Sequence, residues 1–517
     1  TKEVIGFRPL GITSFYRRLL SLEPCKEACA MYTEYMVKNG LYGCGAESGT
    51  EVPAAYWQVM CELHPKTAIA TADAIHAFNY LHRHVILEEL DKTAEGKRLK
   101  WAFYAFYGES SATWYRLMDG QMRKIDVGRG VIQGCSWGTL FFNIAYARVI
   151  KQVREKFGNQ VLPLSIHDDT TQGSIEPTVD ERLVESFIYL KECGGKAGFK
   201  YGNSKDLFAC YHEETRAELQ RQLNARAETR HITVTGAPFK VAGNLVAGER
   251  ASATRGETML RTLSQETTKF NARHDRLEKV GLDTQTHLTY IRQAGGSTVM
   301  LNHIARGQPP SQSLQALKAA HERIKLTVAR AFGMPDNLFN DHDDRGHQLS
   351  RRFFNRRSEG GSGIVDISVT AAPAFLASKL DVLRYFQGDN LYWLTDMEKD
   401  STQWNQSQSP TLREASDILG NITQHAIPLH IVGSKPQHLA LWRKISDPLP
   451  EISEGAKQRR VLDPKLLQAF ASNRRFNSYT KHGRQEKPSL QQLFSHLLLN
   501  ITRKAEVTDN PNLPTVL

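Results

Sequence analysis

The feature that most constrains the fold is the stretch LPLSIHDDTTQGS, residues 162–174, in which two adjacent acids follow an apolar run and precede a polar turn. Carboxylates side by side repel and raise each other's pKa unless positive charge lies between them. An apolar run followed by turn residues predicts that Asp168 and Asp169 lie at a strand end or hairpin tip. A second pair, Asp343 and Asp344 in NLFNDHDDRGHQ, lacks the apolar approach. For that pair the sequence predicts only a solvated loop.

A third acid has a similar setting upstream. Asp73 follows the short β-prone run AIATA and precedes an amphipathic helical pattern. Three acids that converge at strand ends can hold two divalent cations about 4 Å apart, which clamp the attacking and leaving oxygens of a phosphoryl displacement. Carboxylate oxygens suit Mg²⁺. Helix caps and turns account for most acids in such positions. The order of further motifs along the chain therefore has to show whether these three acids form a metal site.

Length and charge limit the class of protein. The chain has 517 residues, beyond the size at which one core keeps growing, so more than one unit is expected. Its formal net charge of +11 favours a polyanionic partner such as nucleic acid, although basic enzymes without such a partner also exist. No apolar segment reaches the roughly 18 residues of a membrane span, and no signal-peptide pattern occurs, so we expect an intracellular protein with no membrane partner.

Cysteines and local patterns indicate the organisation. The seven cysteines all fall within the first 210 residues without a CxxC pair, which argues against a disulfide framework or a zinc knuckle. Helix and strand signals alternate up to about residue 250, helical periodicity dominates from 251 to 330, and residues 355–366 have linker composition. Near the C-terminus basic residues exceed acidic ones, which favours a nucleic-acid path or a solvated helical face. The basic residues of this segment are Lys457, Arg459, Arg460, Lys465, Arg474, Arg475, Lys481, Arg484 and Lys487.

Collinear motifs over roughly the first 250 residues resemble those of the reverse transcriptases of non-LTR retrotransposons. The matching segments are GFRPLGITSFYRRLL, LYGCGAESGTE, Asp73–Asn79, Gly130–Gly138, Ile166–Asp169, Gly198–Lys205 and Val241–Leu245. The AFN form of the first palm motif is similar to the lineage that carries a restriction-like endonuclease. The endonuclease and zinc fingers of such an element would lie outside this chain.

The resemblance implies an α/β right-hand polymerase fold. Fingers and palm, with an antiparallel palm sheet, would occupy residues 1–250, a helical thumb 251–330, and a basic, mostly helical extension 331–517. The implied activity is RNA-directed DNA polymerisation, which extends a DNA primer on an RNA template from deoxynucleoside triphosphates. Two Mg²⁺ ions, with Mn²⁺ as a substitute, are the implied cofactors. An active retrotransposon product would work in the nucleus within a ribonucleoprotein that contains other proteins.

The resemblance also assigns catalytic roles. Asp73 and Asp168 would ligate both metals, and Asp169 would support the site. Lys205 would balance phosphate charge or protonate the leaving pyrophosphate, with an ordinary surface lysine as the alternative.

Further residues would bind the substrates. Arg8 would hold the triphosphate, because a guanidinium binds phosphate in a bidentate manner. Phe78 would clash with a 2′-hydroxyl and so select deoxynucleotides; the alternative is a core phenylalanine on an amphipathic helix. Gln133 and Gly134 would lie close to the template and the nascent base pair, with a plain turn as the alternative.

Some residues depart from the family pattern. His167 replaces a small or aliphatic residue, Ile166 an aromatic one and Trp137 a smaller apolar one. A histidine beside the acid pair can crowd a metal or titrate near neutrality. These departures leave open a domesticated protein that holds RNA as a scaffold with little or no polymerase activity. Retention of all three acids favours the enzyme, and Phe78 argues against an RNA-templated RNA polymerase.

Overall fold

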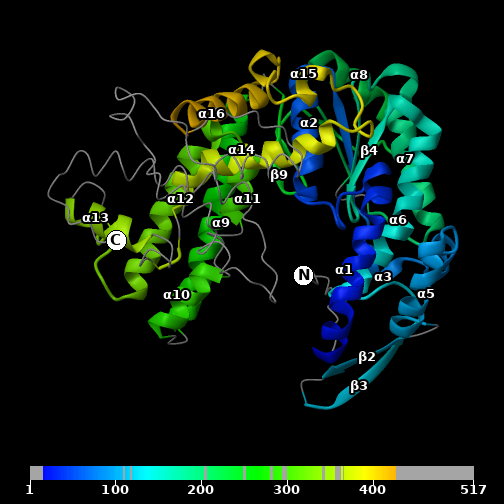
Figure 1. The fold of residues 1–517 in the computed structure, drawn as a ribbon. Coiled ribbons are helices and arrows are strands. Elements are labelled where there is room, and N and C mark those ends of the chain that lie inside the picture. The colour runs from blue at the N-terminus through cyan, green and yellow to red at the C-terminus, as the bar shows by residue number, and fades with distance from the viewer. Residues whose placement is uncertain are drawn as a thin grey trace, which may run out of the picture. The chain divides into compact units, whose positions relative to one another are not determined.

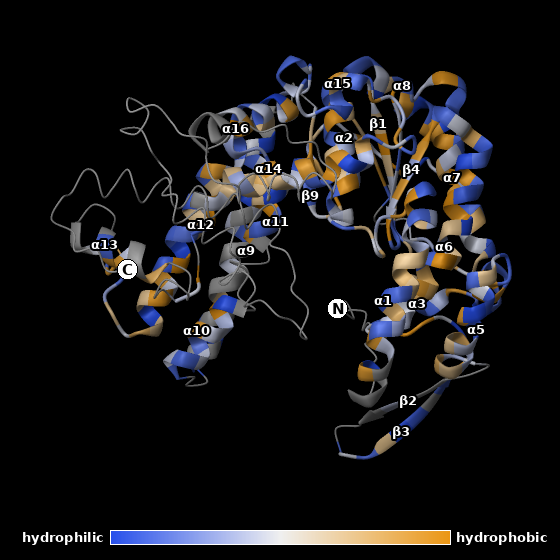
Figure 2. Cartoon of the chain, in the orientation of Figure 1, coloured by the Kyte–Doolittle hydropathy of each residue, from blue (hydrophilic) through white to orange (hydrophobic). Residues whose placement is uncertain are grey.

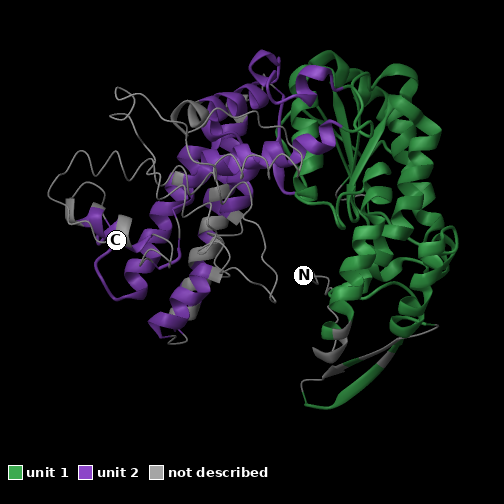
Figure 3. Cartoon of the chain, in the orientation of Figure 1, with its two compact units in different colours: residues 1–242, 388–393 green, residues 243–387, 394–517 purple. Residues whose placement is uncertain are grey.

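The computed structural model describes residues 15–108, 111–116, 119–202, 206–248, 252–279, 283–293, 300–339, 344–354, 362–364 and 366–426. The chain divides into two compact units, coloured separately in Figure 3. The first unit comprises residues 1–242 together with 388–393, and the second comprises 243–387 and 394–517.

The first unit is an α/β structure built around one mixed sheet (Figure 1). Its described helices are α1 (Phe15–Lys38), α2 (Val52–Leu63), α3 (Ala77–Tyr80), α4 (Arg83–Leu90), α5 (Ala94–Phe106), α6 (Ser136–Phe157), α7 (Arg182–Lys196) and α8 (Glu213–Asn224). Its strands are β1 (Ala68–Ala72), β2 (Ser111–Arg116), β3 (Met122–Val127), β4 (Leu162–Ile166), β5 (Asp169–Ser174), β6 (Leu207–Cys210), β7 (Val234–Thr235) and β8 (Phe239–Val241).

The five-stranded sheet has the order β4-β5-β1-β6-β7. The first four strands pair antiparallel, as predicted for the palm, whereas β7 pairs parallel to β6. The sheet is therefore mixed, and the predicted antiparallel pairing does not extend to this edge. Strands β2 and β3 form a separate antiparallel hairpin.

Side chains of β5 alternate between two helical layers, because neighbouring residues of a strand point to opposite faces. The Trp57 indole of α2 donates a hydrogen bond of 2.9 Å to the Thr171 hydroxyl on one face. On the other face the hydroxyl groups of Tyr146 in α6 and Thr170 are joined at 2.7 Å. A side chain at Gly173 would lie 2.5 Å from the Trp57 ring, so this position must be glycine for α2 to lie on the sheet.

The core of the first unit forms mainly around α6. This helix carries a row of fully buried aromatic side chains, because its apolar residues recur at helical spacing. The row comprises Trp137, Phe141, Phe142 and Tyr146. Figure 2 shows orange, hydrophobic strands in the sheet and mixed colours on the helices, the pattern of a buried sheet under amphipathic helices.

A short segment from late in the chain packs with the first unit. The hydroxyl of Tyr56 in α2 donates to the Tyr392 carbonyl at 2.6 Å. The guanidinium of Arg154 in α6 donates to the Asn390 carbonyl at 2.5 Å and lies over the Tyr392 ring. Residues 388–393 therefore complete this unit, although 145 residues separate them from its main part, which ends at residue 242.

The second unit is mostly helical in its described part. Its elements are β9 (Asn244–Val246), α9 (Ser252–Lys279), α10 (Thr284–Gln293), α11 (Met300–Gly307), α12 (Pro310–Ala331), α13 (Asp344–Phe353), α14 (Ile367–Phe386), α15 (Asp396–Lys399) and α16 (Pro410–Ala426). Apolar residues of α11, α12 and α14 share one buried cluster. Among the helices that the structure describes, none has the length and apolar character of a bilayer-crossing segment.

Candidate functional site

The register of the sheet brings the three predicted acids to one edge. Ala72 of β1 pairs with Thr170 of β5, so the next residues in this register are Asp73 and Asp169. Ile166 pairs with Asp169 across the β4–β5 hairpin, which leaves His167 and Asp168 as its two-residue turn. Cross-strand neighbours on one face lie about 5 Å apart, so the end of β1 and this turn present their carboxylates to the same edge.

Two histidines beside these acids have left-handed backbone. His167 has φ 56° in the hairpin turn, and His76, three residues after Asp73, has φ 47°. A non-glycine residue in this region is held there by its surroundings at a cost of about 1–3 kcal/mol, and such residues concentrate at functional sites. The strain on both sides of the acids therefore supports a functional role for this edge.

Buried hydroxyl groups next to the turn hold the β4–β5 hairpin in place. The Ser165 hydroxyl donates to the His167 carbonyl at 2.6 Å and lies 3.1 Å from the Thr170 hydroxyl. Burial raises the pKa of Tyr146 to about 12, and the nearby charges of Asp168 and Asp169 act in the same direction. The phenol of Tyr146 therefore stays protonated at neutral pH and bonds to Thr170, which fixes the base of the turn.

The His167 side chain is half-buried, and its ring is held by a contact with Asn143. Its Nδ1 lies 2.9 Å from the Asn143 side-chain nitrogen, which also donates to the Thr139 carbonyl at 2.7 Å. A carbonyl only accepts, so the Asn143 amide must be the donor to both and Nδ1 must be unprotonated. Burial lowers the pKa of His167. The ring is therefore neutral at physiological pH.

Phe78 lies on α3 between the turn and the core. Its ring stacks on Phe142 with centroids 4.2 Å apart and meets His167 edge-on at 6.1 Å. The side chain is only partly buried. One face of the Phe78 ring therefore packs on the core, while part of the ring stays accessible. Its role in the selection of deoxynucleotides stays a prediction.

The loop that contains Gln133 and Gly134 is docked onto α3. The Val131 amide donates to the Phe78 carbonyl at 2.7 Å, and Gly130, with φ 70°, has no room for a side chain against the Asn79 carbonyl. Gly134 is exposed with φ 98°. The loop is therefore fixed next to the first acidic motif by its own backbone.

Residues 199–202 lie beside the strand end that carries Asp73. The Ile75 amide donates to the Lys200 carbonyl at 2.7 Å, and Ala74 forms a bridge with Tyr201. Tyr201 is partly buried, and burial of its phenol group raises its pKa well above the usual value. Two segments separated by about 125 residues are thus joined at the residues that directly follow Asp73.

Two cations near the site, Arg129 and Lys200, were not predicted from the sequence. The Arg129 guanidinium lies 4.9 Å from the Tyr80 ring centroid, and the Lys200 ammonium lies 4.6 Å from it. Arg129 also donates to the Tyr80 carbonyl at 2.6 Å. Both cations are exposed. The signal in the sequence was their position at two motifs: Arg129 directly precedes Gly130, and Lys200 lies within the segment Gly198–Lys205.

Some predicted residues are not placed. Arg8, Lys205 and the basic residues from Lys457 onward lie outside the described residues. The second acid pair differs from the first: Asp343 is also outside them, and Asp344 begins α13 rather than lying in a loop. The loop prediction for Asp344 is therefore wrong, because helical residues follow it at once.

The metal assignment rests on donor type and backbone register. Carboxylate oxygens are the ligands that Mg²⁺ prefers. Within the described part of the chain, no three His, Cys, Asp or Glu side chains are arranged to hold a metal ion. Asp168 is half-buried and Asp169 is exposed, so both are accessible from the edge of the sheet.

Comparisons with known proteins give distant structural likeness. No protein-family profile matches the chain. No curated protein matches it either. Among solved structures, telomerase from Candida albicans with a fragment of telomeric RNA is 11% identical, with a TM-score of 0.34 over 72% of this chain and 56% of that chain. Apo telomerase from Candida tropicalis is 11% identical, with a TM-score of 0.37 over 77% and 61%. The chain thus spans less than two thirds of the length of these structures.

Proposed function

We propose that the chain is an RNA-directed DNA polymerase of reverse-transcriptase type with a right-hand fold. The single observation that carries the proposal is the register that puts Asp73 opposite Asp169 at the turn end of a hairpin whose turn contains Asp168. The collinear motifs in the sequence are the second support. The first unit would supply fingers and palm, and the helices after residue 250 the thumb.

Asp73, Asp168 and Asp169 would hold two Mg²⁺ ions, which would offset the negative charge on the oxygens of the displacement. The buried hydroxyl groups of Ser165 and Thr170 would keep the turn in place while the substrates bind. Arg129 and Lys200 would attract phosphates, because exposed cations beside the acids favour a polyanion. Lys205 and Arg8 would act on the leaving pyrophosphate and on the triphosphate.

Phe78 would discriminate between sugars. Stacking on Phe142 prevents the ring from moving away from a 2′-hydroxyl. A Phe78→Val variant would then incorporate ribonucleotides more readily, and Phe142→Leu, which removes the stacking, would relax the selectivity to a smaller extent. Equal selectivity in wild type and Phe78→Val would remove this role.

Primer extension on an RNA template with Mg²⁺ tests the proposal. We expect wild-type protein to incorporate deoxynucleotides and Asp168→Asn to lose about 10³-fold or more in rate, since metal ligands contribute several kcal/mol to such reactions. Asp344→Asn, in the second acid pair, is the matched control and should retain full activity. RNA binding without incorporation by wild type would identify the alternative, an RNA-binding scaffold of a ribonucleoprotein.

A further inference from the structure

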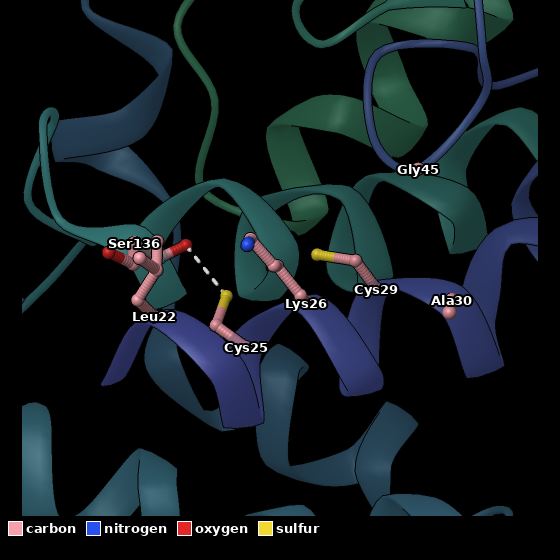
Figure 4. A pocket seen from close by; sticks show the side chains of 7 residues that line it. All are labelled: Leu22, Cys25, Lys26, Cys29, Ala30, Gly45 and Ser136. Atoms are coloured by element: carbon pink, nitrogen blue, oxygen red, sulfur yellow. Dashed lines mark hydrogen bonds between the residues drawn. The ribbon is translucent and has the colours of Figure 1, made fainter. Parts of the chain in front are cut away.

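Three cysteines gather where α1 meets the segment that follows it. Cys25 and Cys29 are four residues apart and therefore share one face of the helix with Lys26, as Figure 4 shows. The Cys29 and Cys44 sulfur atoms are 3.4 Å apart. The Cys25 thiol donates to the Ser136 carbonyl at 3.2 Å. Residues distant in sequence thus form one cluster of thiols.

A cavity of about 300 Å³ opens onto the thiols of Cys25 and Cys29. Leu22, Lys26 and Ser136 line it together with Cys25 and Cys29 (Figure 4). Its volume is at the lower end of the range for small-molecule sites. The cavity therefore has room for a small reagent next to the thiols.

Cys29 is the accessible thiol of the cluster. It is half-buried, whereas the other six cysteines are buried. Hydrogen bonding within the thiol cluster lowers the pKa of Cys29, because it stabilises the thiolate. The pKa of Cys44 is raised by its hydrogen bond to Cys29 and by burial. The thiolate is the nucleophile in thiol–disulfide exchange. Cys29 is therefore suited to attack the reagent first, and Cys44 to react with Cys29 in a second step.

We propose that Cys29 and Cys44 form a thiol–disulfide exchange site for small anionic disulfides such as oxidised glutathione. The Cys29 thiolate attacks one sulfur of the reagent, forms a mixed disulfide and releases one glutathione thiolate. Cys44 then gives up its proton and attacks the Cys29 sulfur, which releases the second glutathione thiolate. Two protein thiols are oxidised to one disulfide, and one small disulfide is reduced to two thiols.

The geometry assigns the second step to Cys44 rather than Cys25. Sulfur atoms 3.4 Å apart reach the bonded separation of about 2 Å through small side-chain rotations. Cys25 instead donates to the Ser136 carbonyl on α6. Gly45, whose added Cβ would lie 3.1 Å from the Cys29 carbonyl, keeps the Cys44 segment against α1.

Lys26 gives the site its preference for an anion. Its side chain lines the cavity one helical turn from Cys29, and its ion pair with Glu23 is long, at 3.6 Å, and exposed. Such exposed pairs are weak, so the ammonium remains able to attract carboxylates of the reagent. Oxidised glutathione carries carboxylates, whereas cystamine is cationic.

The bond would also constrain the candidate polymerase site. Cys44 directly follows Gly43, which lies against His167 of the acidic turn. A disulfide between Cys44 and Cys29 of α1 would therefore fix the backbone one residue from the contact between Gly43 and His167.

Peptide mapping of the whole protein under non-reducing conditions tests the proposal without any measurement of polymerase activity. After incubation with oxidised glutathione, we expect a Cys29–Cys44 cross-linked peptide in wild type and a glutathione adduct at Cys29 in Cys44→Ser. Cys25→Ser should still form the cross-link. Adducts that appear equally fast at buried Cys61 or Cys193, or a wild-type protein without the cross-link, would overturn the proposal.

A second experiment compares disulfide reagents of opposite charge. Lys26→Gln should slow the reaction with oxidised glutathione about two- to fivefold, because one favourable charge is removed from the mouth of the cavity. The reaction with cystamine should not slow. Equal effects on both reagents would disprove the role of Lys26 in selection.

Discussion

Gly43 lies directly against His167 of the acidic turn. A Cβ added to Gly43 would be 2.7 Å from Nδ1 of His167 and 2.8 Å from its backbone nitrogen. The segment before Gly43 is fixed to β4, because the Tyr42 amide donates to the Ser165 carbonyl at 2.9 Å. The glycine-rich segment and the turn therefore support each other through a contact that no larger residue permits.

Gly43→Ala should destabilise the protein and impair the turn. The backbone nitrogen of His167 cannot move aside as a flexible side chain would, so we expect a loss of about 1–3 kcal/mol, typical of overpacking. Denaturant unfolding measures it. Gly195→Ala is the control, because nothing lies within 4 Å of its added Cβ on α7. That variant should be neutral or more stable by about 0.5–1 kcal/mol. Equal stability of both variants would contradict the packing argument.

Stability should depend on pH through His167. Burial lowers its pKa in the folded protein below the ordinary value of 6.5, so the unfolded chain binds the proton more readily. The neutral ring contributes its full stability above about pH 6.5, and this stability is lost as pH falls from there to the lower folded pKa. Unfolding free energies of wild type and His167→Asn at several pH values measure the effect.

Asn keeps a hydrogen-bond group near Asn143 and tolerates positive φ better than histidine. We therefore expect a flatter pH dependence below 6.5 in His167→Asn. His82→Asn is the comparison: burial, Arg129 and His84 also lower the pKa of His82, but its greater exposure predicts a smaller change. An unchanged slope in His167→Asn would show that this ring is not responsible.

Arg129 and Lys200 should contribute to binding of nucleic acid. Replacement of either by Gln should weaken RNA binding with little sequence dependence and lower the salt slope by about 1 for each phosphate that is no longer neutralised. Fluorescence anisotropy with labelled RNA across salt concentrations measures both quantities. Lys151→Gln is the matched control, because Lys151 is paired with Glu155 on the exposed side of α6. An equal decrease in the control would indicate an effect of net charge alone.

Arg83 should be necessary for the position of the Gln133 loop. Its buried guanidinium donates to the Gly130 carbonyl and to the Tyr107 carbonyl, each at 3.0 Å. Arg83→Met would leave both acceptors without this donor, at about 1–3 kcal/mol each. Thermal unfolding should show a clear decrease, whereas Arg221→Met, which removes an exposed ion pair with Glu218 on α8, should change stability little. A small effect at Arg83 would contradict its anchoring role.

Local pattern correctly predicted the parts of the fold whose signal lies within a few residues. The apolar run before Asp168 forms β4, and the short run before Asp73 forms β1. The parallel edge between β6 and β7 was missed, because strand direction depends on the connection between strands. The start of α13 at Asp344 was missed as well, because the residues around it lack a clear local helix signal.

By itself the sequence determined the identity and order of the acidic motifs and the apolar strands that lead to two of them. Only the tertiary structure decided that β1 lies beside β5, that the neutral His167 ring contacts Asn143, and that two cations meet at Tyr80. The physical reason is that hydrophobic periodicity encodes which face of an element is buried, while partners, register and local electrostatics arise from contacts between residues far apart in the chain.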